Sequence, residues 1–329
     1  MPSRTDDPAR RRRRIGQHAD VTGHELVRYR SGVWDSVRWQ SFSARPGDIV
    51  ISCPPKSGTT WMQMICGLLI FQRTTFDRSL DLISPWLEMQ TREIDDVIAD
   101  LDAQRHRRFI KSHTPLDGLP LDRDVTYICV GRDPRDAAIS WAHHSDNLNL
   151  AALFTARDRA IGNQDLAEMY RDRVPPPADP RERFWRFVDD PASFGDIAHV
   201  NLASTMHHLA TFWEMRSRSN VVLVHYADLQ RDLEGEMRRL AQRLGIDIDE
   251  DRLPDLVDAA RLDSMRERAD VLAPDATQGI LQSNRAFFRR GDGGEWHDLL
   301  DDAGRRRYAE RVRQLASADL IDWTHREAL

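Results

Sequence analysis

Four short apolar runs mark the first two-thirds of the chain: residues 48–53 (DIVISC), 108–113 (RFIKSH), 125–131 (VTYICVG) and 221–226 (VVLVHY). Their apolar positions are continuous rather than alternating, which is typical of strands buried on both faces of a parallel sheet. Each run has the length of a strand and is too short for a helix. The pattern therefore predicts four parallel β-strands.

Segments of helical length and apolar content follow three of these strands, at residues 61–72, 136–144 and 232–245. The last segment ends at Gly245, a residue that favours the end of a helix. Strands separated by helices predict a doubly wound α/β fold, a P-loop-like three-layer sandwich with a parallel sheet and helices on both faces. In such folds, ligands bind at the carboxyl ends of the strands.

The polar segments indicate how the chain is organised. Residues 1–22 are polar and arginine-rich, which predicts a disordered basic tail before a single domain over residues 23–329. Within that domain, residues 145–195 turn polar and irregular, and we interpret them as a lid or an acceptor-binding insertion, with a decorative loop as the alternative. A helical C-terminus is expected from about Asp301.

Composition excludes several classes of protein. The chain has 329 residues, of which 40% are hydrophobic and 30% charged, as in an ordinary soluble globular protein. Its three cysteines form no CxxC pair, and its longest apolar run, residues 61–71, is too short to cross a bilayer. The net charge of −6 argues against a nucleic-acid partner. We expect a reduced cytoplasmic enzyme with no integral membrane segment.

Lysine is rare in this chain. Only two of the 47 basic residues are lysines, Lys56 and Lys111, so the other 45 are arginines. Genome composition explains the preference for arginine but not the two exceptions. A lysine is a compact point charge on a flexible stem and is not interchangeable with a planar guanidinium.

The first lysine lies in a loop between the first predicted strand and the helix after it, in the sequence PPKSGTTW. The loop combines Lys56 with Ser57, Gly58, Thr59 and Thr60 at a helix N-terminus, where free backbone amides and the helix dipole favour phosphate or sulfate. The spacing is not that of the nucleotide-binding loop of NTPases, and no acidic residue is placed to bind Mg²⁺. A simple helix cap is the structural alternative.

Two more elements favour anions. Arg132 follows the third strand, with Ser140 eight residues later, and a guanidinium with a hydroxyl suits a terminal phosphate. Arg289, Arg290 and Gly291 form a third basic cluster in a late glycine-rich stretch. Three such elements at one sheet edge indicate a nucleotide that carries phosphates at two separate places.

The second lysine lies two residues before a histidine, at the end of the second strand. Lys111 and His113 therefore point to the same side of an extended strand. A neutral imidazole can take a proton from a hydroxyl, and the lysine can neutralise charge that develops on a transferred group. A purely structural histidine is the alternative, which the two nearby anion-binding elements disfavour.

In order along the chain, PPKSGTTW, KSHTP, the Arg132–Ser140 spacing, VHYADL and FFRRGDGGEW resemble the motifs of cytosolic-type sulfotransferases that use 3′-phosphoadenosine-5′-phosphosulfate (PAPS). The resemblance spans residues 48–296. RRFIKSHTPLDGL and TYICVGRDPRDAAISW are similar to the mycobacterial glycolipid sulfotransferases in particular. The resemblance to PAPS-dependent sulfotransferases implies direct sulfuryl transfer from PAPS to an acceptor hydroxyl. The product 3′,5′-adenosine bisphosphate (PAP) would be released, and no metal would be needed.

The resemblance also implies roles for single residues. The 5′-phosphosulfate would lie in the loop of Lys56, Ser57, Gly58, Thr59 and Thr60. The 3′-phosphate would be held by Arg132, Ser140, Arg289, Arg290 and Gly291. Trp61 would stack on adenine and Tyr226 would approach it, although from the residues alone both are expected to be core aromatics. His113 would be the catalytic base, assisted by Lys56 at the leaving group and Lys111 at the sulfuryl group.

Other points stay open in the sequence. A Mg-ATP-dependent kinase on the same strand–loop–helix scaffold is the alternative, although it has no use for a 3′-phosphate site. The acceptor is expected to be a small molecule or glycolipid with a hydroxyl group, and His143 and Trp86 are expected to line its site. The insertion aromatics Phe154, Phe184, Trp185 and Phe187 either meet that acceptor or pack against the domain. The oligomeric state is not indicated.

Overall fold

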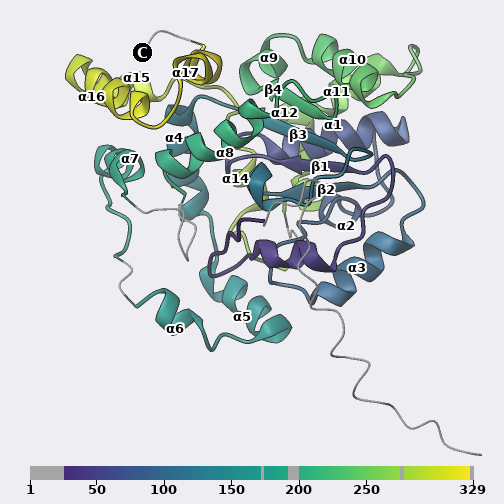
Figure 1. The fold of residues 1–329 in the computed structure, drawn as a ribbon, viewed down its shortest axis with the longest axis horizontal. Coiled ribbons are helices and arrows are strands. Elements are labelled where there is room, and N and C mark those ends of the chain that lie inside the picture. The colour runs from purple at the N-terminus through teal and green to yellow at the C-terminus, as the bar shows by residue number, and fades with distance from the viewer. Residues whose placement is uncertain (1–25, 172–173, 192–199, 275–277, 327–329) are drawn as a thin grey trace, which may run out of the picture.

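The computed structural model of the protein describes residues 26–171, 174–191, 200–274 and 278–326. The predicted basic tail, residues 1–22, lies outside the described residues. Within them, a four-stranded sheet is surrounded by helices (Figure 1). The helices and 3-10 turns of the described residues are η2 (Ser36–Ser41), α1 (Thr59–Phe71), α2 (Leu80–Ile83), α3 (Ile94–Ala103), η3 (Leu116–Gly118), α4 (Pro134–Asp146), α5 (Leu150–Ile161), α6 (Leu166–Met169), α7 (Pro180–Asp189), α8 (Leu202–Glu214), α9 (Tyr226–Arg231), α10 (Leu233–Leu244), α11 (Leu253–Ala259), α12 (Leu262–Glu267), α13 (Ala269–Leu272), α14 (Asn284–Phe287), α15 (Trp296–Leu299), α16 (Asp302–Arg313) and α17 (Ala318–His325).

The sheet confirms the four predicted strands. They are β1 (Ile49–Ser52), β2 (Phe109–Ser112), β3 (Thr126–Gly131) and β4 (Val221–His225), each within a residue or two of its apolar run. The order is β2-β1-β3-β4 and every neighbouring pair is parallel. The chain leaves β1 toward β2 and leaves β3 toward β4, on opposite sides. The crevice between the carboxyl ends of β1 and β3 is therefore the topological switch point, where doubly wound folds bind ligands.

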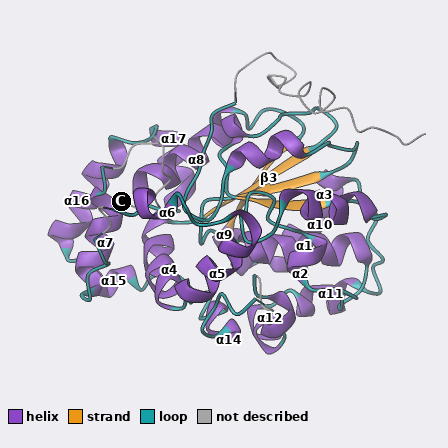
Figure 2. Ribbon diagram, turned by 90° about the horizontal axis from the view of Figure 1, so that it is seen from below, coloured by secondary structure: helices purple, strands orange, loops and turns teal. Residues whose placement is uncertain are grey.

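Two apolar cores, one on each face of the sheet, make the fold a three-layer sandwich. Ile49 and Ile51 of β1 belong to a core shared with α1 and α10, whereas Val50 belongs to a second core shared with α8 and α17. This alternation follows from the pleat, which points successive side chains to opposite faces. Figure 2 shows the strands covered by helices, with α1 on one side of the sheet.

The ends of two helices follow from their glycines. Gly245 has a φ of 62° and ends α10 in the left-handed conformation, as the sequence predicts. Gly58 has a φ of 110° and begins α1. The C-terminus is helical, as expected, in α16 and α17.

The segment 145–195 differs from its expected irregular character. Its described part contains α5, α6 and α7, and α4 extends into it as far as Asp146. Phe184 and Phe187 of α7 are buried in the second core, so for these two aromatics packing against the domain is the correct alternative. Trp185 lies against the same core, and the Arg307 guanidinium lies 3.9 Å from its ring centroid.

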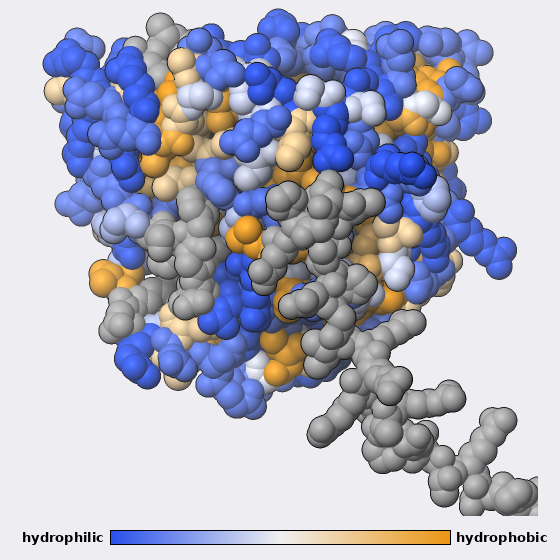
Figure 3. All heavy atoms as spheres, in the orientation of Figure 1, coloured by the Kyte–Doolittle hydropathy of each residue, from blue (hydrophilic) through white to orange (hydrophobic). Residues whose placement is uncertain are grey.

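One face of the molecule is mostly polar. The face drawn in Figure 3 is largely hydrophilic, with apolar side chains in separate small areas. Among the residues that the structure describes, no helix combines the length and the apolar character needed to span a bilayer.

Candidate functional site

The loop between β1 and α1 has the backbone of an anion cradle. Lys56 has a φ of 68° and Gly58 a φ of 110°, so the chain makes a tight left-handed turn before the helix begins at Thr59. A Cβ on Gly58 would lie 2.9 Å from Cδ2 of Tyr226, which leaves room for no larger residue. The turn aims the first amides of α1, a 13-residue helix, at the switch point.

Two hydroxyls of this loop are buried without a partner in the described structure. Ser57 Oγ and Thr59 Oγ1 have no hydrogen-bond partner, and both residues are almost fully buried. Thr60, the next residue, is 8% exposed. Unpartnered buried hydroxyls are costly, so their presence beside a lysine and free helix amides fits the binding of an oxyanion. The loop residues therefore fit a phosphate or sulfate group.

Arg132 lies beside this loop, at the end of β3. Its Nη1 donates to the carbonyl oxygen of Lys56 at 3.1 Å, and its guanidinium lies 4.3 Å from the ring centroid of Tyr226. Its Nε is buried and has no partner among the described residues. Arg132 thus supports the loop through Nη1, and its Nη2 lies 3.4 Å from the Asp292 carbonyl of the late glycine-rich stretch.

The late glycine-rich stretch folds back over Tyr226. The carbonyl oxygen of Gly291 accepts hydrogen bonds from the Tyr226 hydroxyl at 3.0 Å and from Gln230 at 2.6 Å. Arg289 pairs with Glu295 at 2.6 Å. Arg290 lies 3.7 Å from the same carboxylate, and 63% of its side chain is exposed.

The remaining predicted cofactor residues come from α1, α4 and α9. Ser140 is half-buried on α4, the helix that follows Arg132. Trp61 and Tyr226 are both half-buried, with ring centroids 5.1 Å apart in an edge-to-face arrangement, and Trp61 Nε1 donates to the Ala260 carbonyl at 2.8 Å. These two aromatics pack on the first core, as the residues alone predict, and remain partly accessible beside Arg132.

Two charges next to Arg132 have a structural role. Arg135 is only 2% exposed. It donates two hydrogen bonds to the Asp133 carboxylate, and its guanidinium lies 3.6 Å from the ring centroid of Trp296. Asp136 accepts a hydrogen bond from the Gly294 amide at 2.8 Å. Both residues therefore hold the late stretch against α4.

His113 has a fixed tautomer. Its Nδ1 lies 2.7 Å from the carbonyl oxygen of Cys53, which can only accept, so the proton is on Nδ1 and Nε2 carries a free lone pair. Burial, followed by the charge of Lys111, holds the pKa of His113 well below its usual value. The imidazole is therefore neutral over the physiological pH range and can accept a proton at Nε2.

The charges of both lysines act on this histidine and lower its pKa. Lys56 Nζ lies 4.3 Å from the ring centroid of Phe287, and Lys111 Nζ lies 4.6 Å from that of Trp86. Trp86 also contacts His113 edge to face, with centroids 4.8 Å apart. Burial, and then the charges of Arg132, Lys111 and Arg289, lower the pKa of Lys56 to about 7. The site is thus a cluster of cations around one neutral base.

Glu88 supports the strand of the base and was not found by sequence reasoning. It is fully buried, and its Oε1 accepts hydrogen bonds from the hydroxyls of Ser112 and Thr114, the two neighbours of His113. Trp39 Nε1 donates to the same oxygen at 2.7 Å. Burial raises the pKa of Glu88. No spacing or periodicity in PWLEMQ marks this glutamate.

His143, which the sequence predicts to line the acceptor site, and its neighbour His144 point in different directions. The His143 side chain is half exposed and its Nε2 lies 3.9 Å from the Glu295 carboxylate. His144 points inward instead: its Nδ1 is buried without a partner in the described structure, and its ring lies 5.8 Å from Phe287. Burial, then the charges of Lys56 and Lys111, hold its pKa well below the usual value, so it is neutral.

Metal ligands do not gather here. Across the described ranges, no group of three or more His, Cys, Asp or Glu side chains is placed to hold a metal ion.

Comparison with known proteins fits this geometry. Residues 46–319 match the sulfotransferase domain family. A glycolipid sulfotransferase of Mycobacterium bovis is 44% identical over 316 residues, which cover 92% of this chain and 94% of the relative. Human sulfotransferase 1C2 is 25% identical over 298 residues, covering 88% and 89%.

Two solved structures share the fold. Mouse sulfotransferase SULT7A1 complexed with PAP has a TM-score of 0.61 and 19% identity, covering 87% of this chain and 91% of its own. Retinol dehydratase with androsterone and PAP has a TM-score of 0.60 and 19% identity, covering 84% and 83%. The family match over most of the sequence and the close relative carry the assignment: this chain belongs to the sulfotransferase domain family.

Proposed function

We propose that in this PAPS-dependent sulfotransferase His113 is the base that receives the proton of the acceptor hydroxyl. The observation that carries the proposal is a neutral imidazole whose proton is held on Nδ1 by Cys53 and whose surroundings include the charges of Lys111 and Lys56, the two lysines of the chain. The lone pair on Nε2 is then available to a hydroxyl. PAPS supplies the activated sulfuryl group when it is bound.

The cofactor residues divide between two phosphate positions. Lys56, Ser57, Gly58, Thr59 and Thr60 would hold the 5′ end, because they supply free amides, an ammonium and unpartnered hydroxyls. The 3′-phosphate would be held by Arg132, Ser140, Arg289, Arg290 and Gly291. Trp61 and Tyr226 would contact the adenine. Lys56 and Lys111 would neutralise the charge that moves during transfer, without any metal ion.

The acceptor that we propose is a glycolipid. Support comes from the relatives in Mycobacterium bovis and Mycobacterium tuberculosis, described as glycolipid sulfotransferases, at 44% identity. A phenol or another small alcohol is the other candidate. We also propose that residues 145–195 act as the lid or acceptor-binding segment, and that the protein works in the cytoplasm, where its three free cysteines would stay reduced.

The competing kinase function finds no support in the family match. A kinase would bind ATP with Mg²⁺, whereas a PAPS enzyme reads a 3′-phosphate. Isothermal titration calorimetry of the protein with PAP, ADP and ATP, each with and without Mg²⁺, separates the two. We expect PAP to bind much more tightly than ADP or ATP, independently of Mg²⁺.

A transfer assay completes the test. With PAPS labelled in the sulfuryl group and a glycolipid acceptor, we expect label in the glycolipid in the presence of EDTA. Equal binding of PAP and ADP, or label transfer that requires a divalent metal, would contradict the proposal.

A further inference from the structure

The buried carboxylate of Glu88 binds both neighbours of His113 in the chain. Its Oε1 accepts a hydrogen bond from the Ser112 hydroxyl and another, at 2.7 Å, from the Thr114 hydroxyl. Trp39 Nε1 donates to the same oxygen at 2.7 Å, and Glu88 is fully buried. One carboxylate oxygen therefore receives three donors, and two of them are the hydroxyls on either side of the proposed base.

The chain around His113 is closed into a turn by these contacts. The Thr114 amide donates to the Ser112 hydroxyl at 3.0 Å, and the Thr114 carbonyl accepts from the Ser52 hydroxyl at 2.5 Å. Successive side chains of an extended chain point to opposite sides, so the side chain between two hydroxyls gathered on one oxygen points away from that oxygen. His113 does so, and its Nδ1 meets the carbonyl oxygen of Cys53 at 2.7 Å.

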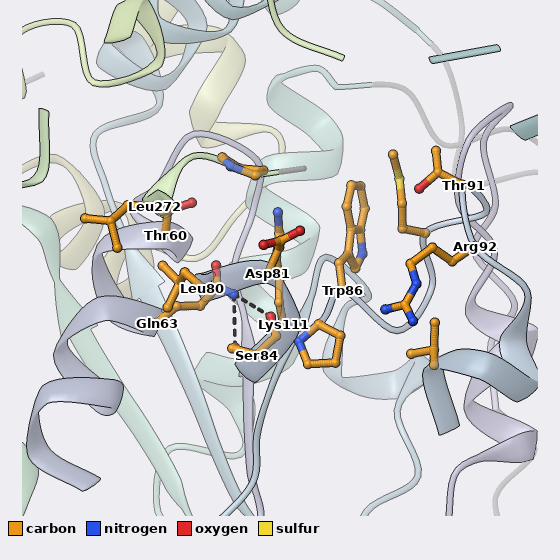
Figure 4. Close-up of a pocket in the computed structure, with 14 residues that line it drawn as sticks. Thr60, Gln63, Leu80, Asp81, Ser84, Trp86, Thr91, Arg92, Lys111 and Leu272 are labelled. Carbon is orange, nitrogen blue, oxygen red and sulfur yellow. Dashed lines mark hydrogen bonds between the residues drawn. The ribbon is translucent and has the colours of Figure 1, made fainter. Parts of the chain in front are cut away.

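Glu88 is itself fixed to the strand that carries the base. The segment before it pairs with β2: the Lys111 amide donates to the Pro85 carbonyl at 3.0 Å, and the Leu87 amide donates to the Lys111 carbonyl at 3.4 Å. Figure 4 shows Trp86 and Lys111 next to each other in this paired region, where the ammonium lies 4.6 Å from the ring centroid. The carboxylate and the strand therefore belong to one hydrogen-bonded unit.

The position of this unit decides where the base lies. To take a proton, His113 must hold Nε2 within hydrogen-bond reach of the acceptor hydroxyl. The bond to Cys53 fixes the tautomer, and the turn on Glu88 fixes the backbone from which the imidazole projects. A displacement of about 1 Å at a reacting group can cost about 100-fold in rate, so both contacts matter for turnover.

We infer that Glu88 is a positioning residue for His113, which it aims through the hydroxyls of Ser112 and Thr114. The inference rests on the proposed function and deepens it. Glu88 acts as an acceptor of hydrogen bonds and not through its charge. A side chain that keeps one carbonyl oxygen at this place should therefore replace it.

Two pairs of variants test the two ends of the contact. Glu88→Met removes the acceptor oxygen, whereas Glu88→Gln keeps a carbonyl oxygen without the charge. Thr114→Val removes one donor, whereas Thr114→Ser keeps it. The matched control is Thr205→Val, which removes another buried hydroxyl, one that donates to the Asn201 carbonyl at 2.9 Å at the start of α8.

Three measurements are made on the full chain of each variant. Calorimetry with PAP reports the fold and the cofactor site. Steady-state kinetics with PAPS and octyl glucoside, the glycolipid probe, give kcat and KM separately. Nitrogen-15 NMR of the histidines in the PAP-loaded protein reports which ring nitrogen of His113 carries the proton, and the His113→Ala variant identifies its signals.

We expect Glu88→Met and Thr114→Val to lower kcat about 10- to 100-fold while the Kd for PAP stays within twofold of the wild type. In both variants the nitrogen-15 shifts of His113 should move from those of a single Nδ1–H tautomer toward those of a mixture. Glu88→Gln, Thr114→Ser and Thr205→Val should keep kcat within about threefold of the wild type and keep the single tautomer.

A Glu88→Met variant that binds PAP and keeps the kcat and the tautomer of the wild type would overturn the inference. So would equal losses in Glu88→Gln, which would assign the role to the charge, or in Thr205→Val, which would make the loss one of general stability. If Glu88→Met does not fold, Thr114→Val compared with Thr114→Ser decides.

Two further outcomes are kept apart by the design. The NMR measurement needs no acceptor, so it decides the inference even if octyl glucoside is not a substrate. A His113→Ala variant that turns over like the wild type would refute the proposed base. An inactive His113→Ala beside fully active Glu88→Met and Thr114→Val variants would overturn the positioning role alone.

Discussion

The lowered pKa of Lys56 predicts that cofactor binding takes up a proton. Burial, and then the charges of Arg132, Lys111 and Arg289, bring its pKa to about 7 in the free protein. A bound phosphate dianion in contact with this amine favours its charged form and moves the pKa back toward the usual value of a lysine, about 10.4. The complex then holds more protons than the free protein whenever the pH exceeds 7. Affinity must therefore fall as the pH rises.

The pKa of Lys56, about 7, also gives the number of protons taken up and the change in Kd for PAP. At pH 8 a group with a pKa of about 7 is roughly one-tenth protonated, so PAP binding should take up about 0.9 proton. The Kd for PAP should rise about 50-fold between pH 7 and pH 9 and should change little between pH 6.5 and pH 7 on account of this group. The phosphates lose their second protons near pH 6, so they contribute little above pH 7.

The assay is calorimetry of PAP binding in pairs of buffers that differ in ionisation enthalpy, at pH 7, 8 and 9. Lys56→Arg is the control, because a guanidinium stays protonated over this range and removes the linkage while keeping the charge. A wild type whose Kd is flat from pH 7 to pH 9 would refute the reasoning. So would a Lys56→Arg variant with the same slope, since another group would then be the one that titrates.

Three further predictions concern single residues. His113→Ala should lower kcat about 10²- to 10⁴-fold without changing PAP affinity. Because the pKa of His113 lies well below its usual value, wild-type kcat should not fall between pH 7 and pH 6. A fall in that range would mean that another group is the base. Gly58→Ala should lower Tm and abolish PAP binding, because the new Cβ would lie 2.9 Å from an aromatic ring at a φ of 110°. Gly245→Ala should lower Tm alone, because Gly245 has a positive φ but open space around it. Thermal melts measure the first effect and calorimetry with PAP the second. His144→Ala should lower kcat/KM for the acceptor in steady-state assays, whereas His143→Ala should not. The reverse result would mean that His143, not His144, contacts the acceptor.

The strands, and the polar residues that lie at their carboxyl ends, were predictable from the sequence. Strands buried on both faces need continuous apolar runs, and the ends of parallel strands meet at one edge, so local patterns were enough to bring Lys56, His113 and Arg132 together. The helices of residues 145–195 also had local signals. Asn149 caps α5, and Asp179 followed by a proline begins α7. These helices expose more residues than they bury, so the segment is mostly polar and its capping signals were overlooked.

Other parts of the site depend on tertiary placement, which local patterns do not carry. His143 and His144 are neighbours on one helix, and about 100° of rotation decides which faces the lysines. Glu88 reaches the strand of His113 because the segment before it pairs with β2, where Trp86 bridges to Lys111. The local sequence around Glu88 does not predict that this segment pairs with β2.

The two lysines connect composition to mechanism. Elsewhere the chain uses arginine for its cations, yet at the proposed reaction centre it has amines that lie over the rings of Phe287 and Trp86. An arginine would stay protonated in this cationic cluster, so the free site would hold one more buried charge. Lys56 can release its proton while the site is without an anion and regain it when phosphate arrives. The residue that the composition marks as exceptional is thus the one whose charge can follow the anion.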